Sequence, residues 1–154
     1  MEGDLLTPQD FIAAIGPAAQ ASAAKTSVPA SFTVAQAALE SGWGSHAPGN
    51  NLFGIKADHS WAGDITTQMT RECIAGHWIV IEAQFRAYPD WQGCMDDHAE
   101  FLHANPRYVG AFKHADGEGF ARAVAAAGYA TDPAYAQKLI ATMRAHKLSA
   151  LDAS

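Results

Sequence analysis

The sequence predicts an α+β protein in which a small antiparallel β lobe lies beside a mostly helical lobe. Three observations carry this prediction. Apolar residues recur at helical spacing in the first 40 residues and again after residue 91. Between these regions, residues 65–88 are rich in β-branched and aromatic side chains, which favour strands. A stretch rich in glycine and asparagine at 41–54 is typical of an ordered loop between the first helices and the strands.

The bulk composition bounds the class of protein. A chain of 154 residues is long enough to bury a sizeable core, so we expect residues 1–154 to form a single domain. Hydrophobic content of 49% against 17% charged residues argues against disorder. The net charge of −6, with no run of Lys or Arg, argues against a nucleic-acid partner. No uninterrupted apolar stretch reaches about 18 residues, so no stable membrane insertion is expected.

The first helix is predicted to begin at Pro8. Thr7 is a suitable N-cap, proline suits the first helical position, and Asp10 adds negative charge to the first turn. A helical apolar stripe follows at Phe11, Ile12 and Ile15. Gly16-Pro17 is expected to end or kink this helix, and the alanine-rich residues 18–24 to resume it.

A second helix is predicted over about 32–39. Pro29 cannot sit inside a regular helix, so it either closes the first helical region or opens the second. The apolar face of the second helix is expected to comprise Phe32, Ala35 and Leu39. Glu40 therefore lies at the C-terminal end of an apolar helix.

The remaining elements follow from turn and cap signals. Residues 65–88 predict a β-hairpin or a three-stranded lobe, with Ala75-Gly76 as a turn between two strands. A helix near Trp91 is expected to stop before Pro106. A short helix over 118–127 is followed by a glycine that ends it. Asp132-Pro133 then predicts the N-cap and first position of a last helix, which reaches about residue 147.

Glu40 is the strongest catalytic candidate because of its local setting. The partial negative charge at the carbonyl end of a helix and desolvation by Leu39 and Trp43 would both raise the pKa of its carboxyl group. A carboxylic acid that keeps its proton near neutral pH is what a glycosidase needs as a general acid. An ordinary surface glutamate near a helix end is the competing interpretation.

A glycosidase usually needs a second carboxylate, and the β segment offers candidates. They are Asp64, Glu72 and Glu82. A β lobe could fold Glu72 over a cleft opposite Glu40. The alternative is a solvated charge on an exposed strand.

Aromatic side chains offer faces on which sugar rings stack, although core packing is their commoner use. Trp61 is the best stacking candidate because it lies in a predicted loop, whereas Trp78 is expected in the core. Tyr129 lies between a helix end and a helix start, free to project into a cleft and to donate a hydrogen bond.

The histidines and cysteines show no pattern of a metal site. His98 and His103 are five residues apart, which separates them by about 140° around a helix, and no cofactor or metal is expected. Cys73 and Cys94 are too few for a disulfide framework, so we favour two unpaired thiols and leave a single disulfide open.

Several of these segments together resemble the bacterial glucosaminidase family, glycoside hydrolase family 73, whose members include autolysins, flagellum-associated hydrolases and phage lysins. The matching segments, in the family's order, are 37–44, 50–56, 70–72, 85–88, 105–108 and 128–136. Each segment alone is weak, but the ordered set is highly specific. It covers most of the chain and places the domain core at about 8–147.

The resemblance implies a lysozyme-like α+β fold with a substrate cleft, and hydrolysis of the β-1,4 bond after N-acetylglucosamine in peptidoglycan. Glu40 matches the general acid, Glu72 the second carboxylate and Tyr129 a further catalytic or binding residue. The side chains expected to contact substrate are Trp43, Asn51, Phe53, Trp61, Tyr108 and Asp132. A muramidase that cuts the neighbouring bond, a non-catalytic glycan-binding module and a zinc amidase are the alternatives.

The expected partner is the glycan strand of peptidoglycan, bound by a monomer. Residues 1–6 lack the basic segment and apolar core of a secretory signal. We therefore expect a chain made in the cytoplasm that acts on the cell wall or in the periplasm as a phage lysin, or a domain cut from a periplasmic flagellar hydrolase.

Overall fold

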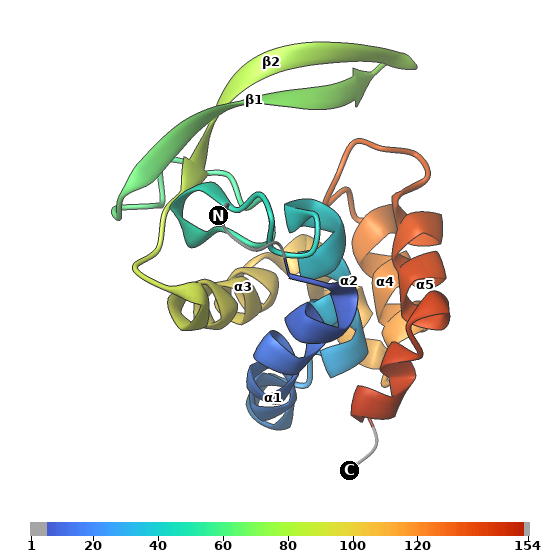
Figure 1. The fold of residues 1–154 in the computed structure, drawn as a ribbon. Helices are drawn as coiled ribbons and strands as arrows, with labels where there is room; N and C mark the ends of the chain where they lie inside the picture. The colour runs from blue at the N-terminus through green and yellow to red at the C-terminus, as the bar shows by residue number, and fades with distance from the viewer. Residues whose placement is uncertain (1–5, 153–154) are drawn as a thin grey trace.

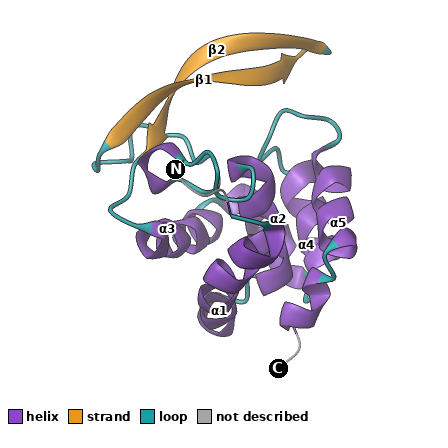
Figure 2. Ribbon diagram, viewed as in Figure 1, coloured by secondary structure: helices purple, strands orange, loops and turns teal. Residues whose placement is uncertain are grey.

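A helical lobe and a β-hairpin make up the computed structural model, which describes residues 6–152 (Figures 1 and 2). The hairpin arches over one end of the helical lobe. This arrangement confirms the predicted α+β class with its small antiparallel β lobe. Within residues 6–152, no helix has both the length and the apolar character needed to cross a membrane.

Helix α1 (Pro8–Thr26) begins as predicted, with a reciprocal cap. The backbone N–H of Asp10 donates to Thr7 Oγ1 at 3.1 Å, and the Asp10 carboxylate accepts from the Thr7 N–H at 3.5 Å. The helix does not end at Gly16-Pro17, one of the two expected outcomes, because α1 runs through Pro17 as one element. Pro17 and Ala13 both lie on the exposed side, so water can reach the Ala13 carbonyl that loses its helical donor.

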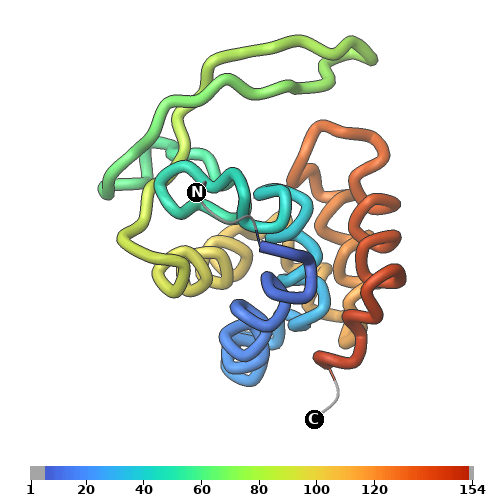
Figure 3. The backbone as a smooth tube through the Cα atoms, in the orientation of Figure 1, coloured from blue at the N-terminus to red at the C-terminus, as the bar shows by residue number. Residues whose placement is uncertain are grey.

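Helix α2 (Ala30–Ser41) occupies the middle of the helical lobe (Figure 3). Pro29 is its N-cap, so the proline opens the second helix. The prediction of one apolar face is too narrow, since every residue from 30 to 38 is buried and α1, α4 and α5 all contact this helix. Small alanine side chains let neighbours approach from all sides. Gln36, which the sequence pattern did not place in the core, is fully buried.

The β lobe contains two strands, so the hairpin alternative is the correct one. Strand β1 (Ile65–Ile74) pairs antiparallel with β2 (His77–Arg86), and Glu72 lies opposite Ile79. The turn residues Ala75 and Gly76 have φ of 53° and 80°, as a two-residue type I′ turn requires. Beside β2, only a single bridge from Lys56 to Phe85 extends the sheet among the described residues.

The helices after the hairpin lie close to their predicted positions. Helix α3 (Trp91–Ala104) ends before Pro106, and α4 (Gly117–Ala126) is followed by Gly128, whose φ is 90°. Helix α5 (Tyr135–Ala145) starts later than predicted. Asp132 Oδ1 accepts a hydrogen bond from the Ala134 N–H at 2.8 Å, but residues 133–134 form a turn, so Asp132 is not the N-cap. Three short 3-10 helices, which carry no periodic signal, were not predicted: Pro48–Asn50, Pro106–Lys113 and Leu148–Asp152.

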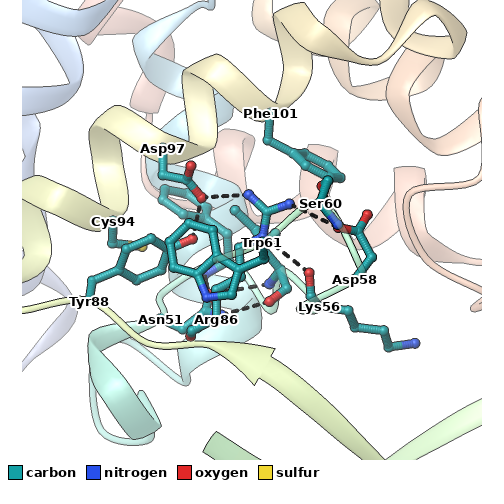
Figure 4. A network of polar contacts seen from close by, with 12 residues as sticks. Asn51, Lys56, Asp58, Ser60, Trp61, Arg86, Tyr88, Cys94, Asp97 and Phe101 are labelled. Atoms are coloured by element: carbon teal, nitrogen blue, oxygen red, sulfur yellow. Dashed lines mark hydrogen bonds and ion pairs between the residues drawn. The ribbon is translucent and has the colours of Figure 1, made fainter. Parts of the chain in front are cut away.

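Arg86 fixes the base of the hairpin to the helical lobe (Figure 4). Its Nη1 donates to Asp97 Oδ2 on α3 at 2.9 Å, and its Nε donates to the Lys56 carbonyl oxygen at 3.2 Å. The guanidinium also lies over the rings of Trp61 and Phe101, at 4.8 and 5.4 Å from their centroids. A buried arginine that is hydrogen-bonded through two of its nitrogens and stacked on two rings holds a definite geometry. The hairpin is therefore held in place above the helices.

Candidate active site

A cleft with a volume of about 620 Å³ lies between the hairpin and the helical lobe. The hairpin contributes Glu72 to its wall, and the helical lobe contributes Glu40, Tyr129 and Tyr135. The fold thus brings Glu40, Glu72 and Tyr129, the three expected catalytic residues, to one cleft. Clefts between lobes are common places for enzyme active sites.

Glu40 lies in the last turn of α2, just before the left-handed C-cap at Gly42. Tyr135 donates its hydroxyl proton to Glu40 Oε2 at 2.6 Å. Burial raises the pKa of Glu40 to about 7, and the negative charge of Glu72 adds to this rise. The hydrogen bond from Tyr135 and the positive charge of Lys56 both oppose it. The predicted direction of the pKa shift is confirmed, and a large fraction of Glu40 is still protonated near neutral pH.

Gly54 closes one side of the Glu40 carboxylate. Its φ is 64°, and a Cβ atom at this position would lie 3.0 Å from Glu40 Oε1. A side chain here would be strained by the backbone and would push the carboxylate aside. The glycine of the 50–56 segment therefore leaves the room that Glu40 occupies.

A buried chain of hydrogen bonds extends from Glu40 into the core. Gln36 Nε2 donates to Tyr135 Oη at 2.9 Å, and His98 Nε2 lies 2.6 Å from Gln36 Oε1. Because the Gln36 oxygen can only accept, the hydrogen of the His98 ring lies on Nε2. Burial lowers the pKa of His98 to about 3, so the ring is neutral. The chain holds the Tyr135 hydroxyl with its proton directed at Glu40.

Glu72 faces the cleft from β1 as an ionised carboxylate. Its Oε1 accepts from Thr131 Oγ1 at 2.8 Å, while Oε2 accepts from Lys56 Nζ at 3.0 Å and from Thr70 Oγ1 at 3.4 Å. Burial alone would raise the pKa of Glu72, but these hydrogen bonds and the Lys56 charge outweigh it and hold the pKa below its usual value. The environments of the cleft therefore move the two pKa values apart, with that of Glu40 raised to about 7 and that of Glu72 lowered.

Tyr129 lines the cleft, but its hydroxyl proton is already engaged. Its Oη donates to the Phe53 carbonyl oxygen at 2.9 Å, and its ring is parallel to that of Tyr135 at 6.0 Å. The hydroxyl was expected to be free to donate to a ligand; in this geometry it can accept but not donate. Tyr129 therefore supports both the Tyr135 ring and the turn that carries Gly54.

Three of the expected substrate-contacting residues also line the cleft: Asn51, Tyr108 and Asp132. The Asn51 side chain is used structurally, because its Oδ1 accepts from the Phe53 and Ile55 N–H groups and its Nδ2 donates to the Ile55 and Arg86 carbonyls. Asp132 forms an ion pair with Lys138. Tyr108 is 1% exposed, and its buried hydroxyl has no hydrogen-bond partner within residues 6–152.

The other three expected contacts lie outside the cleft lining. Trp43 packs its ring on Phe11 and His146. The ring of Phe53 is fully buried and stacks on His98 at 3.6 Å. Trp61 packs on Arg86 and Tyr88, although its sequence context favoured a loop open to sugar.

Trp78 corrects the sequence expectation in the opposite direction. It was expected in the core, but it is 45% exposed and lines the cleft near the hairpin tip. The Arg71 guanidinium lies 4.7 Å from the centroid of its ring. A two-stranded hairpin has no second layer of its own to cover its side chains, so even a tryptophan stays exposed there.

Two polar residues of the site were missed as functional candidates. Tyr135 falls within the predicted last helix, and Lys56 is the last residue of the matching segment 50–56, but neither was given a role. Among residues 6–152, no three His, Cys, Asp or Glu side chains are grouped to hold a metal ion. Cys73 and Cys94 are free thiols, as favoured, and Cys94 is buried.

Comparison with known proteins places this chain in a family. A family model described as mannosyl-glycoprotein endo-beta-N-acetylglucosaminidase matches residues 16–148. The chain is 41% identical over 141 residues to the peptidoglycan hydrolase FlgJ of Vibrio parahaemolyticus, spanning 87% of this chain and 46% of that protein. It is 36% identical over 152 residues to the exo-glucosaminidase LytG of Bacillus subtilis, spanning 94% of this chain and 53% of LytG. The chain therefore spans about half the length of these relatives.

Solved structures share the fold. A peptidoglycan hydrolase mutant from Sphingomonas sp. A1 superposes with a TM-score of 0.85 at 39% identity, over 93% of this chain and 97% of that one. The catalytic domain of the autolysin Auto from Listeria monocytogenes gives a TM-score of 0.77 at 31% identity, over 98% and 90% of the two chains. Both likenesses extend over nearly the whole of this chain.

Proposed function

Because the chain belongs to the glucosaminidase family of glycoside hydrolases, family 73, we propose that it cleaves the β-1,4 bond after N-acetylglucosamine within peptidoglycan glycan strands. The observation that carries this proposal is the pair of carboxyl groups in one cleft, with the pKa of Glu40 raised and that of Glu72 lowered. Environments that separate two pKa values in this way assign an acid and a base.

Glu40 acts as the general acid in this proposal. Because its pKa is raised to about 7, a large fraction of Glu40 is protonated near neutral pH, and this form transfers its proton to the glycosidic oxygen as the bond to the anomeric carbon breaks. The Tyr135 hydroxyl then stabilises the carboxylate that remains, through the 2.6 Å hydrogen bond. Tyr135, Gln36 and His98 are positioning residues, because they act on the substrate only through Glu40.

Glu72 acts as the base in this proposal. A carboxylate has about four lone-pair sites, and Thr131, Thr70 and Lys56 occupy three of those of Glu72. One site is left to hold and deprotonate a water molecule on the opposite face of the sugar. This arrangement favours inversion of configuration, and the same engaged oxygens disfavour Glu72 as a covalent nucleophile.

The remaining alternative is attack by the acetamido group of the substrate, with Tyr129 orienting it. The Tyr129 proton is directed at the Phe53 carbonyl, which does not support that role. The anomer of the first product, followed by NMR during hydrolysis of soluble glycan strands, separates the two routes. Inversion is expected, and retention would refute the role of Glu72 as a base.

The bond that is cut can be identified separately. Peptidoglycan digested by the protein and then reduced should carry reduced N-acetylglucosamine at its new ends, and reduced N-acetylmuramic acid would instead indicate a muramidase. We place the activity at the cell wall, where the substrate is found. The net charge of −6 gives little attraction to an anionic wall, so affinity must come from the cleft. The proposal assumes a monomer, because the hairpin and helices of one chain complete the cleft.

A further inference from the structure

The hydroxyl group of Thr131 makes two hydrogen bonds to strand β1. Its Oγ1 accepts from the Cys73 N–H at 2.9 Å and donates to Glu72 Oε1 at 2.8 Å. A backbone N–H can only donate, so it takes a lone pair of Oγ1 and leaves the single hydroxyl proton for the Glu72 carboxylate. One hydroxyl group therefore contacts both the backbone of the hairpin and the proposed base.

These two hydrogen bonds join lobes that are otherwise separate at this end of the cleft. Figure 1 shows the loop between α4 and α5, residues 127–134, rising from the helical lobe toward the hairpin. Within residues 6–152, Thr131 makes the only hydrogen bonds or ion pairs between this loop and hairpin residues 67–83. The other polar contact of residues 67–83 with the rest of the chain comes from Lys56, whose side chain is 49% exposed.

The loop that carries Thr131 is itself firmly held. On one side, Tyr129 Oη donates to the Phe53 carbonyl oxygen at 2.9 Å. On the other side, Asp132 Oδ1 accepts from the Ala134 N–H at 2.8 Å. Because neighbours on both sides of Thr131 are fixed to other parts of the helical lobe, its hydroxyl group gives the hairpin a definite point of attachment.

Glu72 lies far from the base of the hairpin and depends on such an attachment. Ile65 pairs with Arg86 at the base, and Glu72 follows seven residues later, about 24 Å away at about 3.4 Å per residue. Over that length, a rotation of about 5° at the base would move Glu72 by about 2 Å. A misplacement of about 1 Å can lower an enzymatic rate about 100-fold. The fixed base alone is therefore too distant to position this carboxylate.

We propose that Thr131 is a positioning residue, whose hydroxyl group fixes the Glu72 carboxylate and holds the hairpin over Glu40. The inference rests on the function proposed above, in which Glu72 is the base. Thr131 acts on the substrate only through Glu72. Thr131 is exposed, but the Glu72 side chain is only 12% exposed, so its carboxylate is shielded from competing water.

The same contact links the closed hairpin to the ionisation of Glu72. Burial raises the pKa of Glu72, and the hydrogen bond from Thr131 is the largest of the contributions that lower it. The other charged groups that face Glu72 or belong to the loop and α5 beside it are Lys56, Glu40, Asp132 and Lys138. Asp132 and Lys138 pair with each other, and a substitution of Thr131 alters none of the four.

The direct test is an NMR pH titration without substrate that follows the Glu72 side-chain carboxyl and the Cys73 amide. Thr131→Val removes the hydroxyl group but keeps the shape of the side chain, and Thr131→Ser keeps the hydroxyl group. Thr67→Val makes the same change on the face of β1 opposite that of Glu72. We expect Thr131→Val alone to raise the midpoint of the Glu72 titration and to shift the Cys73 amide resonance. Both properties should match those of the wild type in Thr131→Ser and Thr67→Val.

Activity on soluble glycan strands gives the second measurement. The kcat of Thr131→Val should fall about tenfold, the lower end of the range for a hydrogen bond to a charged group. The acidic limb of kcat/KM should move to higher pH, because a base loses activity as pH falls through its pKa. Thr131→Ser should restore both properties.

A loss of activity in Thr131→Val with an unmoved acidic limb would overturn the proposal, because a purely structural loop residue gives that result. Equal defects in Thr131→Ser and Thr131→Val would overturn it too. Cleavage of peptidoglycan by a protein whose Glu72 midpoint is the same with and without the Thr131 hydroxyl group would overturn this inference alone. A raised Glu72 midpoint in Thr131→Val, together with no cleavage by the wild type, would count against the proposed function alone.

Discussion

Removal of the Tyr135 hydroxyl is the most informative single change, because it alters Glu40 without touching its carboxyl group. Tyr135→Phe deletes the 2.6 Å hydrogen bond to Glu40 Oε2 and leaves Gln36 Nε2 without its acceptor. That hydrogen bond favours the ionised form of Glu40, so its loss must raise the pKa above the wild-type value of about 7.

The size of the effect follows from the strength of the bond. A hydrogen bond to a charged group contributes about 1.5–3 kcal/mol, and the lower end applies because Glu40 is only partly buried and water can replace the hydroxyl. At about 1.4 kcal/mol per tenfold change in a proton equilibrium, the half-maximum of the alkaline limb should rise by about one pH unit. The sign is fixed, because a general acid loses activity as pH rises through its pKa.

The assay is the pH dependence of kcat/KM on soluble glycan strands, which reports the free enzyme. Tyr108→Phe is the matched control, since it removes another tyrosine hydroxyl from the cleft that has no protein partner within the described residues. Tyr108→Phe should leave the alkaline limb in place. An alkaline limb of Tyr135→Phe at or below that of the wild type would refute the role assigned to Tyr135.

Three further predictions follow from the same geometry. Glu72→Gln should lower kcat by about 100-fold or more, since a base contributes 10²–10⁴-fold, and a wild-type rate would make it a surface charge. The free energy of unfolding of Glu40→Gln should exceed that of the wild type by about 3 kcal/mol at pH 8 and nearly equal it at pH 4. The reason is that a carboxyl pKa raised from 4.5 to about 7 on folding destabilises the wild type as pH rises through that window. Equal melting temperatures of the two proteins at pH 8 would contradict the burial argument. Gly54→Ala should destabilise the protein by about 1–2 kcal/mol and displace Glu40, whereas Gly110→Ala, which meets no atom within 4 Å, should leave activity unchanged.

Features set by neighbours along the chain were predictable from the sequence. The Thr7–Asp10 cap of α1 and the Ala75-Gly76 turn of the hairpin each depend on a few adjacent residues. The placement of Glu40 at the end of α2 and its raised pKa followed from the same local information. Trp43, predicted to contact substrate, packs its ring on Phe11 of α1 and is not part of the cleft lining.

Features set by contacts between distant segments were not predictable. Gln36, His98 and Tyr135 come from three separate helices, and nothing in their local spacing indicates that they form one chain of hydrogen bonds. Trp61 was expected to be open to sugar and Trp78 to lie in the core, and the structure reverses both placements for the same reason. Arg86 draws Trp61 inward, while the hairpin has no second layer of its own to cover Trp78. Periodicity reports which residues are apolar, and burial depends on what the fold places against them.

The central claim is that Glu40 supplies the proton that cleaves peptidoglycan after N-acetylglucosamine. The most direct measurement is the digestion of purified peptidoglycan by wild type and Glu40→Gln, with reduced products identified by mass spectrometry. Glu82→Gln, on the exposed side of the hairpin, serves as the matched control. We predict new reduced N-acetylglucosamine ends from wild type and Glu82→Gln and none from Glu40→Gln. Comparable product from Glu40→Gln, or no new ends from wild type, would contradict the account.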